Sequence, residues 1–430
     1  MPSVTRRTFV IAAASGLATA RLRLANAQVA PSDRIRLGVV GYGSRGTGNL
    51  AEFLRNPEVE CAVICDVDDA HAAKGAANVE SQRGNKPDTH RDFRRVLDRK
   101  DIDALLVSTP DHWHALPTVF GCQTGRDVYV EKPFARTVEE GRAIVTAAQA
   151  NKSIVQMGTQ WRSAQHYADA AAYVQSGKLG SIRSIRAWCY KTWDIQPQSD
   201  CPVPQGVDYD LWTGPCPERA FNPNRFHRNF RWYWDYAGGL ATDLGVHVIN
   251  FCQWATGLEW PTRIASAGSS NVLGTITETP DTQTVLYQFP HYTLTWEHQL
   301  QGTIGPHNAD SGAAFSGAHG TLIASAGGWE VIPDPSVRAV LEAEKHEASP
   351  DGRAAHVRNF LDCIKSREQP VSNPEVGHHV TAIAHLGNIA YRVKDEIEWD
   401  AESERITNSK AADALLFAGY RSPWSLPSAY

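Results

Sequence analysis

The chain has 430 residues, of which 42% are apolar and 21% charged, the composition of an ordinary globular protein. This length exceeds what one typical hydrophobic core serves, so we expect two domains. The net charge is only −5, with both signs interspersed, so the chain lacks the basic footprint of a nucleic-acid-binding protein. A membrane-surface role has no support either, and the expected partner is a small molecule.

The first thirty residues have the pattern of an export signal. Arg6-Arg7 precedes a short apolar run over residues 11–20, and Ala25-Asn26-Ala27 has the small-x-small form of a cleavage site. We interpret residues 1–30 as a twin-arginine signal and linker, cleaved after Ala27. The sequence therefore predicts a periplasmic or otherwise extracytoplasmic protein that the twin-arginine export machinery carries already folded.

A glycine-rich turn follows the first predicted strand, residues 35–40. Gly41-Tyr42-Gly43-Ser44-Arg45-Gly46 leads directly into a helical pattern, which is the strand, turn and helix of a dinucleotide cradle. Gly41 permits the tight turn, Gly43 lets the backbone approach a pyrophosphate, and Gly46 lets the helix pack closely on the strand. Asp66 lies twenty residues after Gly46, where a carboxylate binds the adenosine ribose, so NAD is favoured over NADP.

Strands and helices continue to alternate through the first part of the chain. Apolar strands are predicted at 60–65, 104–108 and 127–130, with helices between them at 70–80, 93–97 and 115–124. Such alternation predicts parallel βαβ units in a doubly wound Rossmann sheet, which binds ligands beyond the carboxyl ends of its strands. We place this domain at residues 31–157.

Polar residues follow two of these strands, as Thr109-Pro110-Asp111-His112-Trp113-His114 and as Glu131-Lys132-Pro133. Loop packing and a cofactor contact are about equally favoured for His112 and Trp113. Lys132 lies just past a buried strand, at the face where a nicotinamide would bind.

These motifs together resemble the Gfo/Idh/MocA oxidoreductases, named after glucose-fructose oxidoreductase and inositol dehydrogenase. In that family the lysine of Glu-Lys-Pro contacts both the cofactor and the reacting substrate oxygen, a role that the resemblance assigns to Lys132. Because folded export can carry a cofactor inside the protein, we expect NAD to be tightly bound, and Asp66 makes NADP less favoured. The expected cofactor contacts are Gly41, Tyr42, Gly43, Ser44, Arg45, Gly46, Asp66, Thr109, Pro110, His112, Trp113, His114, Glu131, Lys132 and Gln160.

The remainder of the chain, residues 158–430, changes character. β-rich patterns at 181–193, 282–289, 292–300 and 321–332 predict an open, mainly antiparallel sheet. The resemblance implies that helices cover one face of this sheet and that the other face makes a homodimer or homotetramer. Helices predicted at 354–366 and 375–394 are expected to pack back on the Rossmann domain. Between them and the first domain, residues 194–236 form a long irregular segment of the kind that often carries binding function.

Asp243 and His247 follow Gly238-Gly239 and are four residues apart, so on one helix they would share a face. Such a pair is either structural or catalytic, with the imidazole taking a hydroxyl proton and the carboxylate orienting it. The family pattern favours the catalytic interpretation, with Lys132, Asp243 and His247 as the catalytic group and His247 as general base. Lys132 itself is the alternative base.

Arginines and aromatic rings crowd residues 225–234, a mixture that suits a polyhydroxylated ligand but equally suits a core or subunit interface. The expected substrate contacts are Lys132, Arg162, Arg225, His227, Trp234, Asp243 and His247. No metal site is expected, and His378, His379 and His385 are assigned to packing or solvent-facing positions. Among eight cysteines, only Cys201 and Cys216 lie in loop sequence and are candidates for a disulfide.

Two functions remain open. The first is a dehydrogenase or oxidoreductase that passes hydride between NAD and a sugar or polyol hydroxyl. Because free NAD is scarce outside the cytoplasm, the second is a redox-neutral glycoside hydrolase or lyase that oxidises, eliminates and then reduces with bound NAD. A protein that only binds ligand is disfavoured by the presence of all three catalytic candidates.

Overall fold

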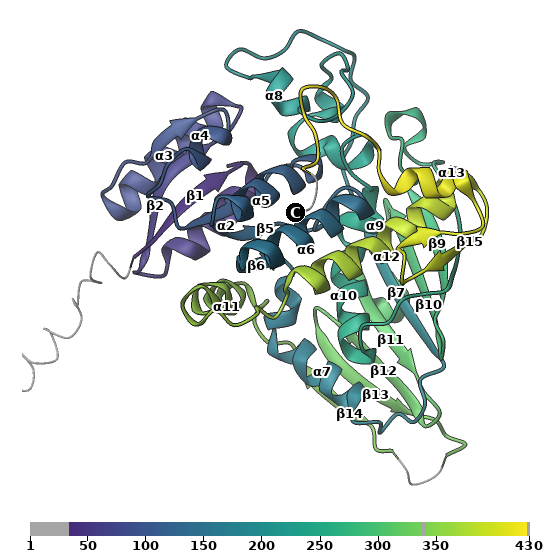
Figure 1. The fold of residues 1–430 in the computed structure, drawn as a ribbon. Helices are drawn as coiled ribbons and strands as arrows, with labels where there is room; N and C mark the ends of the chain where they lie inside the picture. The colour runs from purple at the N-terminus through teal and green to yellow at the C-terminus, as the bar shows by residue number, and fades with distance from the viewer. Residues whose placement is uncertain (1–33, 338–340, 428–430) are drawn as a thin grey trace, which may run out of the picture.

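The computed structural model describes residues 34–337 and 341–427 (Figure 1). The predicted export signal, residues 1–30, lies outside them. No helix among the described residues is both long enough and apolar enough to cross a membrane.

The first domain is a six-stranded, wholly parallel sheet in the order β3-β2-β1-β4-β5-β6. Its strands are β1 (Ile35–Val40), β2 (Val59–Cys65), β3 (Asp88–His90), β4 (Ala104–Val107), β5 (Asp127–Val130) and β6 (Val155–Met157). The helices between them are α2 (Ser44–Leu54), α3 (Asp69–Arg83), α4 (Arg94–Leu97), α5 (Ala115–Gln123) and α6 (Val138–Asn151). β1 and β4 are buried throughout or nearly so, as expected for parallel strands with helices on both faces. The order reverses at β1 and β4, where such sheets bind their ligands.

The second domain is a ten-stranded sheet in the order β14-β13-β12-β11-β7-β10-β9-β8-β15-β16. All its neighbouring pairs are antiparallel except β7 with β10, which run parallel. The strands are β7 (Ser184–Lys191), β8 (Arg263–Ser269), β9 (Thr282–Gln288), β10 (Thr293–Leu300), β11 (Ser311–Ser316), β12 (Gly320–Ser325), β13 (Gly328–Pro333), β14 (Glu344–Glu347), β15 (Ile397–Asp400) and β16 (Arg405–Ile406). The two sheets confirm the predicted fold class, a Rossmann domain joined to an open, mainly antiparallel sheet.

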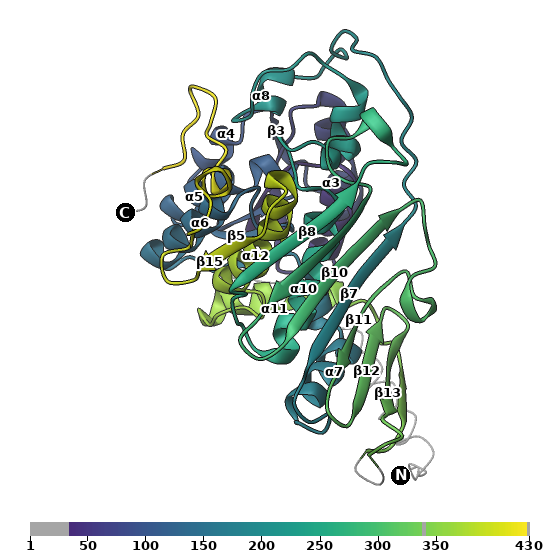
Figure 2. The same ribbon diagram turned by 90° about the vertical axis from the view of Figure 1, so that its right-hand side faces the viewer.

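Helices cover only one face of this large sheet, and Figure 2 shows the strands with the helices behind them. The helices of this part of the chain are α7 (Gln165–Gln175), α8 (Tyr209–Thr213), α9 (Gly239–Asp243), α10 (Gly245–Thr256), α11 (Arg353–Ser366), α12 (Pro374–Val393) and α13 (Lys410–Asp413). The alternation in β9 follows from this, because Val285 and Tyr287 are buried under helices while Thr284, Leu286 and Gln288 face outward.

α11 and α12 join the two domains. Val357 and Phe360 of α11 pack in one apolar cluster with Phe53 and Tyr129 of the Rossmann domain. α12 contacts α6 of the first domain and β8 of the second. The catalytic candidates on α9 and α10 are therefore held against the Rossmann domain by a packed helical layer.

The irregular segment at residues 194–236, which we call the excursion, reaches back to the Rossmann domain. The backbone N–H of Asp69 donates to the carbonyl of Gly206 over 3.0 Å, and that of Asp208 donates to the carbonyl of Val67 over 2.9 Å. Val207 of the excursion also forms an isolated antiparallel β-bridge with Asp68. The excursion thus covers the turn between β2 and α3.

The last described residues fasten the excursion in place. Arg421 donates to the carbonyl of Gly214, and the Trp424 ring lies edge-on to Trp113 with 4.8 Å between ring centroids. Tyr420 donates its hydroxyl to Glu140 over 2.9 Å. The end of the chain therefore ties the excursion to the Rossmann domain from outside.

Candidate active site

The glycine turn after β1 has the shape that a dinucleotide needs. Gly41 has a φ of +89°, in the left-handed region, and a Cβ there would lie 2.8 Å from the Ser108 carbonyl oxygen. A Cβ on Gly46 would clash with the carbonyl of Gly41, so this glycine allows α2 to pack against the turn. A Cβ on Gly43 would meet no atom within 4 Å. The turn is thus closed by Gly41 and Gly46 and open at Gly43, and these residues fit a pyrophosphate at the start of α2.

Asp66 ends β2 at the rim of the same cavity. Its two carboxylate oxygens accept backbone N–H bonds from Tyr42, over 2.7 Å, and from Asp68, over 3.0 Å. Each carboxylate oxygen can accept more than one hydrogen bond, so the fixed group keeps acceptor capacity for ribose hydroxyls. A carboxylate there also repels a 2′-phosphate, which fits NAD better than NADP.

A cavity of about 330 Å³ runs from Asp66 to Lys132. This volume lies within the range of small-molecule sites in proteins. The Rossmann domain contributes the glycine turn, the ends of β2 and β4, and Glu131. The excursion contributes Leu211, Trp212, His227, Arg228, Phe230 and Arg231. Both domains therefore build the cavity.

Lys132 and Asp243 form a buried pair at one end of this cavity. The ammonium of Lys132 donates to Asp243 Oδ1 and to the Asp243 backbone carbonyl, each over 2.6 Å. The two side chains are only 6% and 10% exposed. Burial alone would raise the pKa of Asp243, but Arg231 and Lys132 hold that pKa below its usual range, so the carboxylate is charged. The structure brings together two of the three predicted catalytic residues.

Arg231 completes this cluster and was not among the expected site residues. Its Nε lies 3.0 Å from Asp243 Oδ1, and its guanidinium carbon lies 4.9 Å from the Phe230 ring centroid. In the sequence it is one of several arginines in an aromatic-rich stretch, and no local pattern distinguishes it from Arg225 or Arg228. The contact with Asp243 is what identifies it.

His247 lies close to this pair, but not as one helical face predicts. The chain breaks between α9 and α10 at Leu244, so Asp243 ends one helix and His247 lies in the first turn of the next. Asp243 consequently binds Lys132 and Arg231, and the structure shows no hydrogen bond from it to the imidazole. Asp243 acts on the ring through its negative charge instead, which raises the pKa of His247 against the lowering effect of burial.

The His247 ring is held by Trp161 instead, with 5.3 Å between ring centroids and 30° between planes. Within the described residues its buried Nδ1 has no hydrogen-bond partner. Burial, with the positive charges of Lys132 and Arg45, holds the pKa of His247 well below its ordinary value. The imidazole is neutral at pH 7 and has a free lone pair to accept a proton.

Asp111 is the second cavity residue that was not expected. It is only 5% exposed, it lines the cavity with Lys132 and Arg231, and no other described residue donates a hydrogen bond to its carboxyl group. Burial raises the pKa of Asp111 to about 8, against the lowering effect of Arg231. Its three neighbours in the sequence, His112, Trp113 and His114, had been the more conspicuous candidates.

Those three neighbours bind protein groups. His112 Nε2 lies 2.8 Å from the Trp212 carbonyl, and the Trp113 indole N–H donates to the Leu211 carbonyl over 3.0 Å. His114 contacts the carbonyls of Thr109 and Pro133. Trp113 lines the cavity, but His112 and His114 lie behind its wall. Neither ring reaches the cavity lining where a cofactor contact was predicted, and within the described residues the buried His112 Nδ1 has no hydrogen-bond partner.

The other expected cofactor residues lie mostly at the cavity. Its lining includes Gly41, Gly43, Ser44, Arg45, Asp66, Thr109, Pro110, Glu131 and Lys132. Glu131 is fixed by Asn49, whose side-chain amide donates to it over 2.8 Å. Tyr42 and Gly46 are buried beneath the turn, and Gln160 is not part of the lining.

Several expected substrate contacts lie elsewhere. Arg225 donates to Asp200 and to the Ala220 carbonyl, outside the cavity. Trp234 lines a separate pocket of about 90 Å³, where the guanidinium of Arg392 covers its ring. Arg162 donates to Asn250 and to the Val371 carbonyl and does not reach the cavity lining. The structure therefore places these three side chains outside the cavity lining, each with a protein partner.

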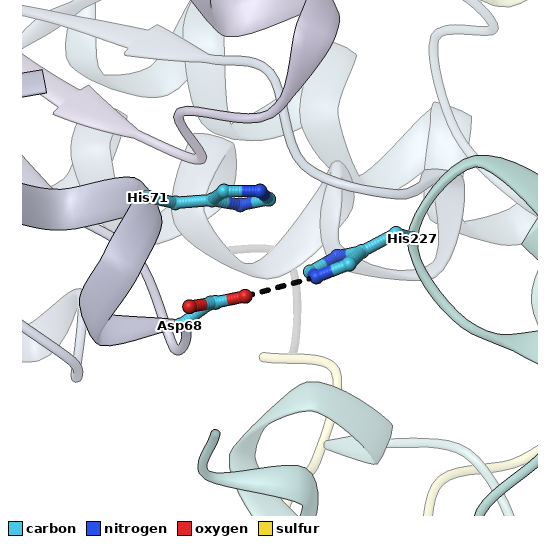
Figure 3. A group of neighbouring side chains, drawn as sticks. All are labelled: Asp68, His71 and His227. Carbon is cyan, nitrogen blue, oxygen red and sulfur yellow. Dashed lines mark hydrogen bonds and ion pairs between the residues drawn. The ribbon is translucent and has the colours of Figure 1, made fainter. Parts of the chain in front are cut away.

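His227 does line the cavity, but at the Asp66 end. Its Nε2–H donates to Asp68 Oδ2 over 3.0 Å, and its ring faces that of His71 with 4.5 Å between centroids (Figure 3). The side chains of Asp68, His71 and His227 offer three ligand atoms within 4.8 Å of one another. The two imidazole planes are tilted by 35°, and the hydrogen bond between His227 and Asp68 joins the excursion to the Rossmann domain.

The remaining loop and helix candidates are structural. All eight cysteines are free: Cys201 is exposed, and Cys216 donates its thiol to the Asp235 carbonyl. The disulfide considered for this pair is therefore absent. His378, His379 and His385 are buried, and each contacts a protein acceptor, respectively Glu404, the Glu259 carbonyl and the Ala135 carbonyl.

Two family models match the chain. Residues 35–159 match the oxidoreductase family's NAD-binding Rossmann fold, and residues 183–426 match the oxidoreductase family's C-terminal alpha/beta domain. Both carry the name GFO_IDH_MocA.

Curated relatives match over a limited length. A glycosyl hydrolase family 109 protein of Shewanella sp. (strain MR-4) is 33% identical over 182 residues, covering 36% of this chain and 40% of the relative. An alpha-N-acetylgalactosaminidase of Shewanella oneidensis is 32% identical over the same length and coverage. The match thus spans about two fifths of these relatives.

Solved structures share the fold over most of the chain. The aldose-aldose oxidoreductase of Caulobacter crescentus, complexed with glycerol, is 18% identical with a TM-score of 0.64, covering 85% of this chain and 99% of its own. Levoglucosan dehydrogenase, complexed with NADH and L-sorbose, is 16% identical with a TM-score of 0.66 and the same coverage. At such identities the likeness concerns the fold.

Proposed function

The chain belongs to the Gfo/Idh/MocA oxidoreductase family, and from that premise we propose that it transfers a hydride between NAD and a hydroxyl-bearing carbon of a sugar or polyol. One observation carries the proposal: the Lys132 ammonium, held by Asp243, lies at the end of a cavity whose other end has the glycine turn and Asp66. A dinucleotide lying along the cavity would bring its reacting end to Lys132.

The residues at that end have separate tasks. Lys132 donates a hydrogen bond to the reacting substrate oxygen and stabilises negative charge on it. Asp243 positions Lys132, through both its carboxylate and its carbonyl. His247, neutral at pH 7, accepts the proton that leaves the hydroxyl. Bound NAD supplies the acceptor for the hydride.

Lys132 is the alternative proton acceptor, because it and not His247 belongs to the cavity lining. Two variants separate these roles. Lys132→Arg keeps a cation but is too basic to accept a proton at neutral pH, whereas His247→Asn removes the base and keeps a polar side chain. If Lys132→Arg retains more turnover than His247→Asn while both keep NAD, His247 is the base; the reverse order makes Lys132 the base.

The excursion supports tight retention of the cofactor. It covers the Asp66 end of the cavity, hydrogen-bonds the turn between β2 and α3, and is fastened by Arg421 and Trp424. A dinucleotide bound in the cavity would have to break these contacts in order to dissociate. We therefore propose that NAD stays bound between turnovers, which suits an extracytoplasmic enzyme without free NAD.

The export signal and the oligomer are also proposals. Residues 1–30 carry the twin-arginine pattern on which we base a periplasmic location. The uncovered face of the large sheet, where Leu286 is 47% exposed, is where we place a homodimer or homotetramer contact.

A redox-neutral glycoside hydrolase is the second candidate, favoured by the relatives named for glycosyl hydrolase activity. Oxidation at one carbon acidifies the neighbouring C–H, elimination breaks the glycosidic bond, and water addition and reduction restore the sugar. The same lysine, aspartate and histidine would hold the oxygen and move its proton. This candidate differs from the first in its products, since NAD ends as it began.

The first experiment is to purify the mature protein and identify bound dinucleotide by mass spectrometry. The protein is then exposed, without added cofactor, to free sugars and glycosides while NADH fluorescence and product release are followed. Lasting fluorescence with a free sugar, reversed by a carbonyl sugar, supports the oxidoreductase. Glycoside cleavage without lasting fluorescence supports the second candidate, and failure to bind any dinucleotide contradicts both.

A further inference from the structure

Asp111 occupies an unusual position in the cavity. It begins a short helical turn, η3 (Asp111–Trp113), after β4, with its side chain on the wall beside Lys132 and Arg231. Its backbone is fixed, because the His114 N–H donates to the Asp111 carbonyl over 3.0 Å. No other described residue donates a hydrogen bond to its carboxyl group, whereas Asp66 and Asp243 each accept hydrogen bonds from other residues. A buried polar group without a partner in a ligand cavity is available to a ligand.

Charges from three other elements face this carboxyl group. Lys132 follows β5, Arg231 lies in the excursion, and Asp243 ends α9. The two cations and the Asp243 carboxylate leave one net positive charge. An ionised Asp111 would cancel it, whereas a protonated Asp111 would preserve it for negative charge that develops on a substrate oxygen.

Burial keeps the proton on Asp111, although Arg231 and Lys132 lower the pKa of its carboxyl group. Lys132 and Arg231 already share Asp243 as their counter-ion, at 2.6 Å and 3.0 Å. Asp111 contacts neither of them closely enough for an ion pair, and burial removes water that would stabilise its charge. Burial therefore raises the pKa of Asp111 to about 8. At pH 7 the group is mainly a neutral acid, which can donate one hydrogen bond.

We propose that Asp111 is a further catalytic residue, whose protonated carboxyl group donates a hydrogen bond to a substrate oxygen beside Lys132 and whose ionisation stops turnover. The proposal rests on the proposed function, because it assigns Asp111 to the same substrate. It involves no net proton transfer, since Asp111 keeps its proton throughout. The ligand it recognises is a hydroxyl or carbonyl oxygen, both of which accept hydrogen bonds.

The test compares Asp111→Asn, which keeps a neutral donor of similar size, with Asp111→Ala, which removes the donor. Asp98→Asn, on a side chain 66% exposed, is the matched control for loss of an aspartate elsewhere in the same domain. Each protein is checked for bound NAD by mass spectrometry. Thermal unfolding and the reduction of bound NAD by the best sugar are then measured from pH 5 to pH 9.

The thermal unfolding measurements show whether Asp111 is protonated in the folded protein, and they do not require the protein to be active. A carboxyl group whose folded pKa lies above its unfolded value stabilises the fold at low pH, and this contribution falls from the unfolded pKa up to the folded one. The thermal unfolding midpoint of Asp111→Asn should therefore rise relative to that of the wild type as the pH increases from 5 to 8. A difference that stays constant with pH would show that Asp111 does not hold its proton and would overturn the proposal.

The activity series tests the catalytic role. We expect the rate of NAD reduction by the wild type to fall above about pH 8 and this fall to be absent in Asp111→Asn. At pH 7 the rate in Asp111→Ala should be at least about tenfold lower than in the wild type, with NAD still bound. An unchanged alkaline fall in Asp111→Asn, or equal losses in the two variants, would overturn the role. A wild-type protein that binds NAD but acts on no sugar or glycoside contradicts both the proposed function and this catalytic role. The unfolding measurements would still show whether Asp111 is protonated in the folded protein.

Discussion

The two ends of the cavity are built on different principles. At the Asp66 end the backbone forms the site: a glycine with positive φ shapes the turn, Gly46 allows close packing, and backbone N–H groups bind a carboxylate. At the Lys132 end, charged side chains from three separate segments compensate one another in a buried cluster. Changes at the first end should therefore act through shape and affect cofactor binding, whereas changes at the second should act through charge and affect turnover.

The largest effect is expected from Lys132→Met at the charged end. Turnover should fall by about 10³-fold or more, because the reacting oxygen loses its donor and Asp243 loses one of its two cations. Single-turnover reduction of bound NAD measures the loss. The double variant Lys132→Met/Asp243→Asn, which removes both members of the pair, should not regain activity. Recovery of turnover in the double variant would contradict the role of Lys132.

Gly43→Ala should affect the other end and leave the fold intact. The added Cβ meets no protein atom within 4 Å but enters the space assigned to the pyrophosphate, so NAD affinity should fall at least about tenfold. Gly48→Ala, on α2 with an equally open Cβ, is the control and should stabilise the helix by about 0.5–1 kcal/mol. Calorimetric titration of each cofactor-free variant with NAD measures the two affinities. Equal NAD affinities in the two variants would contradict the assignment of the pyrophosphate to this turn.

His227→Ala should release NAD several times faster with little change in the hydride step. The histidine joins the excursion to Asp68 and stacks on His71, so its loss loosens the cover at the Asp66 end. Arg225→Ala, in the same excursion but outside the cavity lining, should leave the release rate near that of the wild type. Stopped-flow fluorescence against an excess of competing dinucleotide measures the rates. Faster release in Arg225→Ala than in His227→Ala would show that the excursion acts as a whole.

The smallest effect is expected from Cys201→Ser. The thiol is exposed and unbridged, so the free energy of unfolding should change by less than about 0.5 kcal/mol. Denaturant unfolding with and without reductant measures it. A loss of about 2 kcal/mol or more, seen only without reductant, would indicate a disulfide.

The cradle was predictable because its determinants are local. The apolar strand, the three glycines and the following helix are contiguous, and Asp66 is one strand further on, so spacing alone placed them together. The fold class followed from the same alternation and from the β-rich second half. Lys132 and Asp243 were chosen by resemblance, and their contact joins residues that are 111 positions apart.

The errors at the site have one physical source. His112, His114, Arg225 and Trp234 have the chemistry of binding residues, but distant backbone carbonyls and charged groups occupy their polar atoms or cover their rings. Asp111 was passed over because it stands next to a conspicuous His-Trp-His cluster. Arg231 was passed over because nothing in the sequence separates it from its neighbouring arginines.

The sequence by itself determined the parallel sheet, the cofactor turn and the residue types that can hold a substrate oxygen, because these depend on periodicity and on short spacings. Only the tertiary structure decided which side chains reach the cavity and how they are charged. A pKa depends on burial and on neighbouring charges, and here those neighbours come from β5, the excursion and α9. The chemistry at the Lys132 end therefore belongs to the folded arrangement and to no single segment of the chain.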